Sequence, residues 1–387
     1  MTFEEFFPKA ARLAQKLLND AGFEAYFVGG CVRDFFMSRP ANDFDLTTNA
    51  SSEKIIEVLE KGGFSARLIG GDCGTVGAKK DDLLLEITPY RTETDYKDHR
   101  HPEKVLFVDN IESDLSRRDF TINSLALSFD GEKNSVLDLF GGMDDIKNGI
   151  IRCVGDSEKR FEEDALRVLR ALRFSSRFGF KIHRDTARSM IEKKHLLKFI
   201  SAERKLRELT EILENPEISG LLNDFSPVFS EIVGNFSENS VDFVPKNFCD
   251  RLFYLLRFRP ENELKTLIKN LKCDRKSAEK ILAFKRIFDA LTLEKSTDLE
   301  IICAYGYTAA DYFKIFGSYE KYADVFENPE IPKTVKELQV DGTDLETLGF
   351  SGKEIRIALE KLLYLCVKGE IENKKEKLIF YLKNNRF

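Results

Sequence analysis

The feature that most constrains the fold of this chain is a change of pattern near Gly155. Before that residue, short apolar runs typical of strands alternate with helical segments. After it, strand signals almost vanish and the chain is mostly helical to its end. This order predicts an α+β fold, with a small mixed sheet and its helices followed by an all-helical region. Breaks in the periodicity near 150, 215 and 328, where Pro and Asn occur, predict four domains: 1–150, 151–215, 216–327 and 328–387.

The first 150 residues carry the individual strand and helix signals. Helices are expected where apolar residues recur every three or four positions, and strands where β-branched and apolar residues cluster. The expected helices are 1–20, a second opening at "CVRDFF", and 51–64, the last with a Ser cap and a Gly stop. The expected strands are 24–28 and 42–48, a hairpin over 75–90 with a Lys-Lys-Asp-Asp turn, and one or two strands within 123–140.

Composition excludes several classes of protein. The net charge is −6, so any contact with nucleic acid must come from a local basic patch. The seven cysteines form no Cys-x-x-Cys pair, which argues against structural zinc and disulfides and for a reducing cytoplasm. No apolar run is long enough to span a membrane, and the first twenty residues lack the apolar core of a secretory signal. Nothing indicates an obligate protein partner.

An acidic pair is the first candidate for chemistry. Residues two apart in a strand face the same side, so Asp43 and Asp45 are expected to point into one space, with Phe44 buried behind them. Two close carboxylates repel unless a cation lies between them, and Mg²⁺, which prefers oxygen ligands, suits such a site. Taken alone, an Asp-x-Asp in a solvated strand or turn is the alternative.

A glycine turn precedes the acidic pair. Gly29 and Gly30 follow one predicted strand and open a helix, which allows backbone N–H groups to approach a phosphate. Arg33, on the first turn, is placed to hold a triphosphate; an ordinary strand–helix turn is the alternative. Glu86, on a later strand, is either a third acidic group beside the pair or a surface residue.

Two arginine-rich stretches follow. Arg117 and Arg118 suggest a phosphate clamp, with a solvated charge cluster as the alternative. Further along, four charged residues recur every three positions, which predicts one stripe on a single helix: Asp164, Arg167, Arg170 and Arg173. Arginines at that spacing repel one another unless an anion offsets them. A surface stripe neutralised by distant acids is the alternative to a nucleotide site.

Asp164 and Arg167 suggest recognition of a nucleobase edge. Cytosine and adenine each offer an amino donor next to a ring acceptor, which a carboxylate and a guanidinium match as another base would. Uracil and guanine present the reverse arrangement and would leave buried polar groups unpaired. Such a pair would accept CTP and ATP and exclude UTP and GTP.

The motifs together resemble the class II tRNA nucleotidyltransferases, the CCA-adding enzymes, which are relatives of bacterial poly(A) polymerase in the DNA polymerase β-like superfamily. The resemblance covers nearly the whole chain in the family's order. It rests on five stretches: "GGCVRD…NDFDL", "RRDFTINSLA", "DLFGGMDDIKNGIIRCVG", "EEDALRVLRALRF" and "SAERKLREL".

The resemblance implies a head (palm), neck, body and tail for the four predicted domains. It implies that Asp43 and Asp45 bind two Mg²⁺ ions, with Glu86 as a third carboxylate. It also implies a nucleotide site in which Gly30, Arg33 and Arg118 contact the triphosphate or sugar. Asp164 and Arg167 would read the base, and Arg170 and Arg173 would support the site. The segment Arg91–Val108 is similar to a flexible loop that helps switch from C to A addition, and 340–359 is similar to a tail region that contacts tRNA.

The expected function is therefore addition of C, C and A to the 3′ end of tRNA from CTP and ATP. An enzyme that adds only A, or a poly(A) polymerase, is the nearest alternative; the short tail of mixed charge favours the tRNA enzyme over a poly(A) polymerase. A catalytically inactive RNA-binding module is the alternative outside the enzymes. It would be expected to lack an acidic residue, yet both aspartates of the pair are present.

Overall fold

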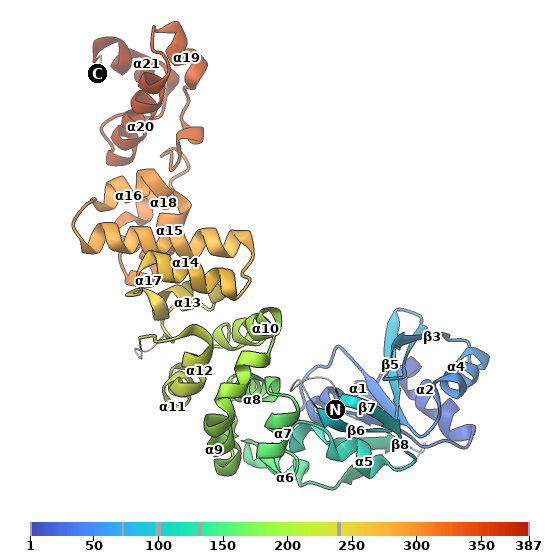
Figure 1. Cartoon of the computed structure of the whole chain (residues 1–387). Helices are drawn as coiled ribbons and strands as arrows, with labels where there is room; N and C mark the ends of the chain where they lie inside the picture. The colour runs from blue at the N-terminus through green and yellow to red at the C-terminus, as the bar shows by residue number, and fades with distance from the viewer. Residues whose placement is uncertain (1, 72, 97–101, 130–133, 238–240, 386–387) are drawn as a thin grey trace. The chain divides into compact units, whose positions relative to one another are not determined.

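The computed structural model describes residues 2–71, 73–96, 102–129, 134–237 and 241–385 (Figure 1). The chain divides into two compact units, Met1–Ile212 with Phe225–Ile232, and Leu213–Asp224 with Val233–Phe387. Within the described residues, all strands lie in the first unit and the second is helical. The predicted α+β class is confirmed. The finer division at 150, 215 and 327 stays a prediction.

The main sheet of the first unit is mixed. Within the described residues it has seven strands in the order β3-β4-β5-β2-β1-β8-β9. The β2–β5 pair is parallel and the other pairs are antiparallel. The strands are β1 (Ala25–Val28), β2 (Asp45–Thr48), β3 (Ser65–Gly70), β4 (Thr75–Lys80), β5 (Leu83–Pro89), β8 (Leu125–Phe129) and β9 (Asn134–Asp138).

Helices α2 (Lys9–Asp20) and α4 (Ser52–Lys61) cover one face of this sheet. Alternation along the strands directs Val76 of β4 and Leu85 and Ile87 of β5 into the core beneath these helices, where all three are fully buried. Most side chains on the opposite face of β3–β5 are exposed, among them Arg67, Lys79 and Leu84. The hairpin predicted over 75–90 is confirmed as β4–β5.

The single helix predicted over 1–20 is wrong. Two helices occur instead, α1 (Phe3–Phe6) and α2, because Pro8 cannot continue the first helix and instead stands at the N-terminal boundary of the second. The helix predicted at "CVRDFF" is α3 (Gly30–Phe36), and the helix predicted over 51–64 is α4, which Ser51 caps as expected.

The rest of the first unit surrounds the sheet with short elements. The segment similar to a flexible loop contains an antiparallel hairpin of β6 (Arg91–Tyr96) and β7 (Pro102–Phe107); residues 97–101 lie outside the described residues. The other elements are α5 (Ile111–Ser116), η1 (Thr121–Asn123), α6 (Gly142–Asn148), β10 (Ile150–Ile151), α7 (Ser157–Glu163), α8 (Leu166–Phe178), β11 (Lys181–Ile182), α9 (Arg184–Lys193), η2 (Lys194–Phe199), α10 (Ala202–Leu213) and α12 (Ser226–Val233).

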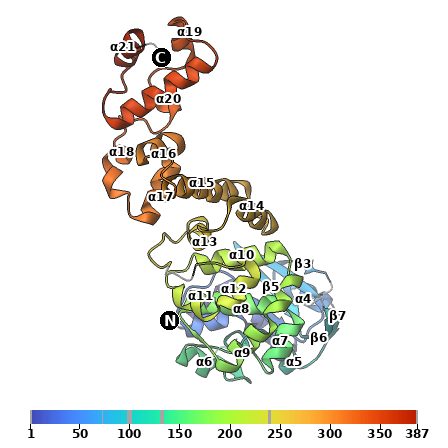
Figure 2. The same cartoon turned by 60° about the vertical axis from the view of Figure 1, so that its left-hand side comes forward.

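The second unit packs its helices around aromatic side chains such as Phe253, Phe284 and Tyr312. Figure 2 gives a second view of its elements. They are α11 (Ser219–Asp224), α13 (Phe248–Leu256), α14 (Glu261–Asn270), α15 (Arg275–Thr292), α16 (Asp298–Tyr305), α17 (Tyr307–Phe316), η3 (Glu320–Tyr322), α18 (Ala323–Glu327), η4 (Val335–Glu337), α19 (Gly342–Thr347), α20 (Lys353–Lys368) and α21 (Lys375–Asn384).

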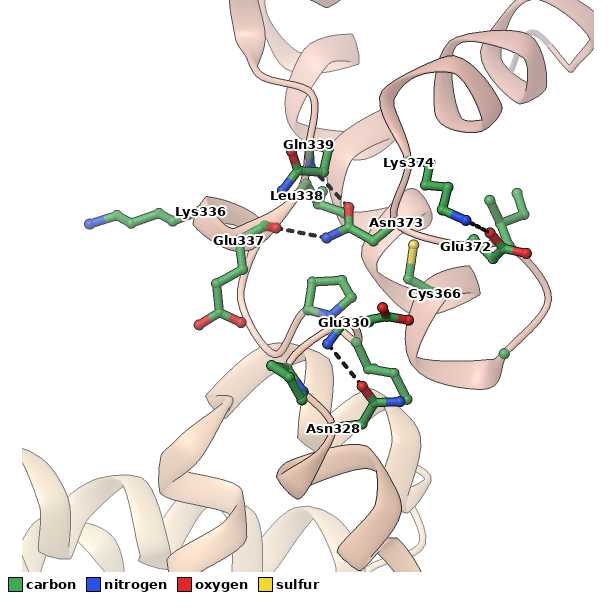
Figure 3. A pocket seen from close by; sticks show the side chains of 15 residues that line it. Asn328, Glu330, Lys336, Glu337, Leu338, Gln339, Cys366, Glu372, Asn373 and Lys374 are labelled. Atoms are coloured by element: carbon green, nitrogen blue, oxygen red, sulfur yellow. Dashed lines mark hydrogen bonds and ion pairs between the residues drawn. The ribbon is translucent and has the colours of Figure 1, made fainter.

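A pocket of about 740 Å³ lies in this unit, between the segment 328–339 and the end of α20 with the residues after it (Figure 3). The side-chain amide of Asn373 connects the two walls of the pocket. It donates to the carbonyl of Glu337 and accepts from the N–H of Gln339, both at 2.9 Å. No helix in the described part of the chain is long and apolar enough to cross a membrane.

Gly142 tests the packing beneath the sheet. A Cβ placed there would lie 2.3 Å from the backbone oxygen of Thr121, which cannot move without disrupting η1. We expect Gly142→Ala to lower the free energy of unfolding by about 3 kcal/mol. At Gly220, in α11, an added Cβ would meet open space, so Gly220→Ala should raise the free energy of unfolding by about 0.5 kcal/mol. Urea unfolding measures both, and a Gly142→Ala protein as stable as the parent would contradict this packing.

Candidate active site

The acidic pair lies at the start of β2. Asp45 is the first residue of the strand, while Asp43 precedes it, so the strand predicted over 42–48 begins three residues later than expected. Phe44, between them, is 6% exposed, and its ring packs against Phe6 and Phe7 at 6.0 and 5.8 Å between centroids. The buried ring anchors this stretch, and both carboxylates retain access to solvent.

Glu86 lies beside Asp45. The parallel pairing of β2 with β5 places the two residues directly opposite each other, which directs their side chains to one face of the sheet. Burial, together with the charges of Glu86 and Asp43, raises the pKa of Asp45 to about 6, although Arg118 acts in the opposite direction. The structure therefore brings the three predicted carboxylates together. Within the described residues, no three His, Cys, Asp or Glu side chains are already arranged to hold a metal ion.

The glycine turn leaves space for an arginine. Gly29 has φ +73°, a conformation that favours glycine, and stands as the N-cap of α3. A Cβ at Gly29 would lie 3.2 Å from Nη1 of Arg118. Arg118 donates to Asp114 at 3.1 Å, while its buried Nε has no hydrogen-bond partner among the described residues. A donor without a partner beside a glycine turn suits an anionic ligand.

Arg33 is held by the protein. It is 4% exposed, donates to Asp34 at 2.9 Å and to Asn123 at 2.7 Å, and its guanidinium lies over the ring of Phe178. These contacts fix the Arg33 side chain in the wall of a pocket in the first unit, described below. Its predicted contact with a triphosphate stays a prediction.

The prediction that Asp164, Arg167, Arg170 and Arg173 lie on a single helix is wrong for Asp164. Helix α7 ends at Glu163 and α8 begins at Leu166, and Asp164 lies between them in an extended conformation, φ −137° and ψ 102°. Its carboxylate accepts from the N–H of Leu166, a hydrogen bond that local side chains such as Asp form in place of helix continuation. Asp164 is therefore beside the arginine stripe of α8 and not on it.

The protein's own carboxylates neutralise the stripe. Each of the three arginines of the predicted stripe forms an ion pair at 2.6 Å with a carboxylate outside α8: Arg167 with Glu163, Arg170 with Asp119, and Arg173 with Glu208. The alternative of neutralisation by distant acids is thus correct in part, although these pairs are largely buried and do not form a surface stripe.

The two candidate base-reading residues both have protein partners. Asp164 accepts from Arg204 of α10 at 2.9 Å and keeps about a fifth of its side chain exposed, 21%. Arg167 donates to the backbone oxygens of Arg160 and Arg117, at 2.9 and 3.0 Å. Nη1 of Arg204 is buried and unpartnered within the described residues.

These residues line a pocket of about 500 Å³ within the first unit. All of the predicted nucleotide-binding residues line this pocket, and so does Asp45. Asp43 and Glu86 lie next to Asp45 but do not line the pocket. Sequence reasoning did not assign seven of the lining residues, of which Arg204 and Arg207 lie in the "SAERKLREL" stretch. The pocket has nine arginines and only three aspartates: Arg33, Arg117, Arg118, Arg167, Arg170, Arg173, Arg177, Arg204 and Arg207, with Asp45, Asp119 and Asp164.

Comparison with known proteins identifies the class. Residues 25–152 match the family model of the poly A polymerase head domain, and residues 179–224 match that of the probable RNA and SrmB-binding site of polymerase A. The head fold and the arginine-rich pocket beside three carboxylates define a nucleotidyltransferase.

Full-length relatives identify the family. The chain is 35% identical to the CCA-adding enzyme of Lactobacillus helveticus and 32% identical to that of Bacillus subtilis, each over 98% of both chains. Its fold matches the crystal structure of the Bacillus stearothermophilus CCA-adding enzyme in complex with CTP, with a TM-score of 0.76, 27% identity and 98% of both chains covered. The chain belongs to the family of the CCA-adding enzymes.

The Asp119–Arg170 pair gives the site a pH-dependent stability. Burial raises the pKa of Asp119, but Arg170 and the amide of Asn123 outweigh it and lower that pKa to about 2. A carboxyl with a depressed native pKa stabilises the fold above its ordinary pKa and loses this contribution as the pH falls through the native value.

We expect Asp119→Asn to lower the free energy of unfolding at pH 7 by about 2 kcal/mol. The difference from the parent should be constant above about pH 5 and shrink below about pH 4. Urea unfolding of both proteins from pH 7 to pH 3 measures it. A difference that grows toward pH 3 would contradict the assigned ion pair.

Proposed function

We propose that this protein adds C, C and A in turn to the 3′ end of tRNA, using CTP and ATP and releasing pyrophosphate. The observation that carries the proposal is the pocket of nine arginines that ends at Asp45, beside Asp43 and Glu86. A nucleoside triphosphate bears several negative charges, and guanidinium groups are the side chains best suited to hold phosphates. The names of the relatives and the RNA-binding family match support tRNA as the acceptor.

The chemistry is an in-line displacement. The 3′-hydroxyl oxygen of the RNA forms a bond to the α-phosphorus of the nucleotide, and the bond from that phosphorus to the bridging oxygen of pyrophosphate breaks. Catalysis of this kind depends on positioning and on stabilising charge. We assign the triphosphate to the N–H groups at Gly29 and Gly30 together with Arg118, since the buried Nε of Arg118 has no hydrogen-bond partner among the described residues.

Mg²⁺ fits the acidic cluster. Asp43, Asp45 and Glu86 offer only oxygen ligands, and burial together with the neighbouring charges of Glu86 and Asp43 raises the pKa of Asp45. Mg²⁺ is usually held by one or two carboxylates, with waters and substrate phosphates completing its shell, so no ready-made protein cage is needed. Asp43 and Asp45 would hold two such ions, whose chemistry would be activation of the attacking hydroxyl and stabilisation of the charge on the phosphates.

Base selection is assigned to Asp164 and Arg167. Asp164 projects from the break between α7 and α8, and Arg204 fixes one of its oxygens, which orients the carboxylate. Glu163 and two backbone oxygens fix Arg167 in the same way. Arg170 and Arg173 support the site through their ion pairs. A rigid pair of this kind selects by the hydrogen-bonding pattern of the base edge.

Three tRNA transcripts test the function, ending at the discriminator base, at the first C and at the second C. Each is incubated with Mg²⁺ and CTP, ATP or both, and the products are sized at single-nucleotide resolution. Three additions to the shortest transcript, followed by a stop, are expected. Addition to the CC-ending transcript alone would identify an A-adding enzyme, and a long A ladder would identify a poly(A) polymerase.

Asp43→Ala is the matching test of the carboxylates. It should abolish turnover while leaving tRNA binding largely intact, since it removes a metal ligand from an exposed position anchored by Phe44. Asp20→Ala, an exposed aspartate at the end of α2, should retain full activity. Gel assays and filter binding measure the two properties, and turnover by Asp43→Ala would refute the metal role.

Asp164→Asn tests base selection. The substitution replaces an acceptor by an amide that can donate, so incorporation of CTP relative to UTP should fall by about 100-fold. Asp185→Asn, on exposed α9, should leave the ratio unchanged. Single-turnover competition between the two nucleotides measures it. An unchanged ratio in Asp164→Asn would remove this residue from base recognition.

A further inference from the structure

The open face of the main sheet continues outward from the carboxylates. Strand pairing places Arg67 of β3 opposite Gly77, Gly77 opposite Glu86, and Glu86 opposite Asp45, so these positions form one row across four strands. The neighbouring row pairs Lys79 of β4 with Leu84 of β5. Because paired residues share a face of the sheet, both rows lie on the face opposite to α2 and α4.

This face, defined by Arg67, Ile69, Lys79 and Leu84, combines cations with exposed apolar groups. Leu84 is 58% and Ile69 is 44% exposed. Ile69 lies across Gly77, where a Cβ would be 3.1 Å from the Ile69 side chain. The side chains of Arg67 and Lys79 are exposed and make no hydrogen bond or ion pair within the described part of the chain. Free cations beside apolar side chains fit a single RNA strand, whose phosphates and base faces require both.

The order of the strands indicates which part of the substrate lies here. In an in-line displacement, the attacking hydroxyl and the leaving pyrophosphate are on opposite sides of the phosphorus. The groups assigned to the triphosphate, which would receive pyrophosphate, lie in the turn after β1 (Gly29 and Gly30) and in the segment before β8 (Arg118). Asp45, on β2, lies next in the sheet, followed by Glu86 on β5, and then β4 and β3. The hydroxyl must therefore approach from the β5–β4–β3 side.

We propose that this face binds the last nucleotides of the RNA acceptor, with Lys79 and Arg67 on its phosphates and Leu84 and Ile69 against its bases, and so delivers the 3′-hydroxyl to the carboxylates. The proposal rests on the proposed function. The exposed acids of the β4–β5 turn, Asp81 and Asp82, repel phosphate, so the strand runs from Leu84 toward β3 and not over the turn.

The double variant Arg67→Ala/Lys79→Ala tests the phosphate contacts. Its control is Lys9→Ala/Lys16→Ala, which removes the same charge from exposed positions of α2, on the covered side of the sheet. We expect the KM for a transcript ending at the discriminator base to rise about 10-fold in the first variant, with kcat and the KM for CTP changed less than about 2-fold. For the Arg67→Ala/Lys79→Ala variant, the slope of the logarithm of the RNA-binding constant against the logarithm of salt concentration should be shallower by about 1.4. This is about 0.7 for each lost phosphate contact.

A crosslinking experiment locates the RNA without relying on turnover. A transcript whose discriminator base is 4-thiouridine is irradiated with the unsubstituted protein, and the linked peptide is identified. A link within 65–90 supports the proposal. A link only in α8 or α10, or equal RNA binding by the two double variants, would overturn it. Failure of the unsubstituted protein to add any nucleotide would instead refute the proposed function, and the binding and crosslinking results would still decide the RNA path.

Discussion

The buried ion pairs of α8 are the constraint on which the candidate site depends. Three arginines at a spacing of three residues cannot lie together in a low-dielectric interior without anions. Asp119 and Glu208, which pair with Arg170 and Arg173, come from segments far from α8 in sequence. Losing one partner of a buried pair leaves an uncompensated charge in the interior, which destabilises the fold. The pairs therefore fix α8 against both the turn before η1 and α10.

The same pairs explain how the pocket can be both rigid and cationic. Arg167, Arg170 and Arg173 pair with carboxylates and serve as walls, and the residues that line the pocket include nine arginines and only three aspartates. Arg118 and Arg204 each keep one buried nitrogen without a partner within the described residues. Donors already fixed in place need little reorganisation when an anion binds, which is the condition under which electrostatic stabilisation is most effective. A chain of net charge −6 thus concentrates positive charge where phosphate would bind.

Local signals in the sequence predicted the parts of the site that depend on neighbouring residues. The strand–glycine–helix turn at Gly29 and the acidic pair around buried Phe44 follow from residue type and spacing alone. The helical stripe failed at Asp164 because its carboxylate accepts from the N–H of Leu166, which competes with helix continuation. The position of Glu86 could not be decided from sequence, since it depends on β5 pairing in parallel with β2 and not only with β4. The carboxylate partners of Arg170 and Arg173 could not be predicted from the sequence either, because they too depend on contacts between distant segments.

Strand order also separates the two halves of the reaction. Because β2 lies between β1 and β5, the triphosphate groups and the open face with Arg67 and Lys79 are on opposite sides of Asp45. Had β5 paired at the other edge of the sheet, Glu86 and the open face would lie beyond β9, away from the acidic pair. The parallel β2–β5 pairing requires a long crossover, which here contains α4, β3 and β4. That crossover supplies the strands of the open face, so one topological choice completes the carboxylate cluster and builds the surface beside it.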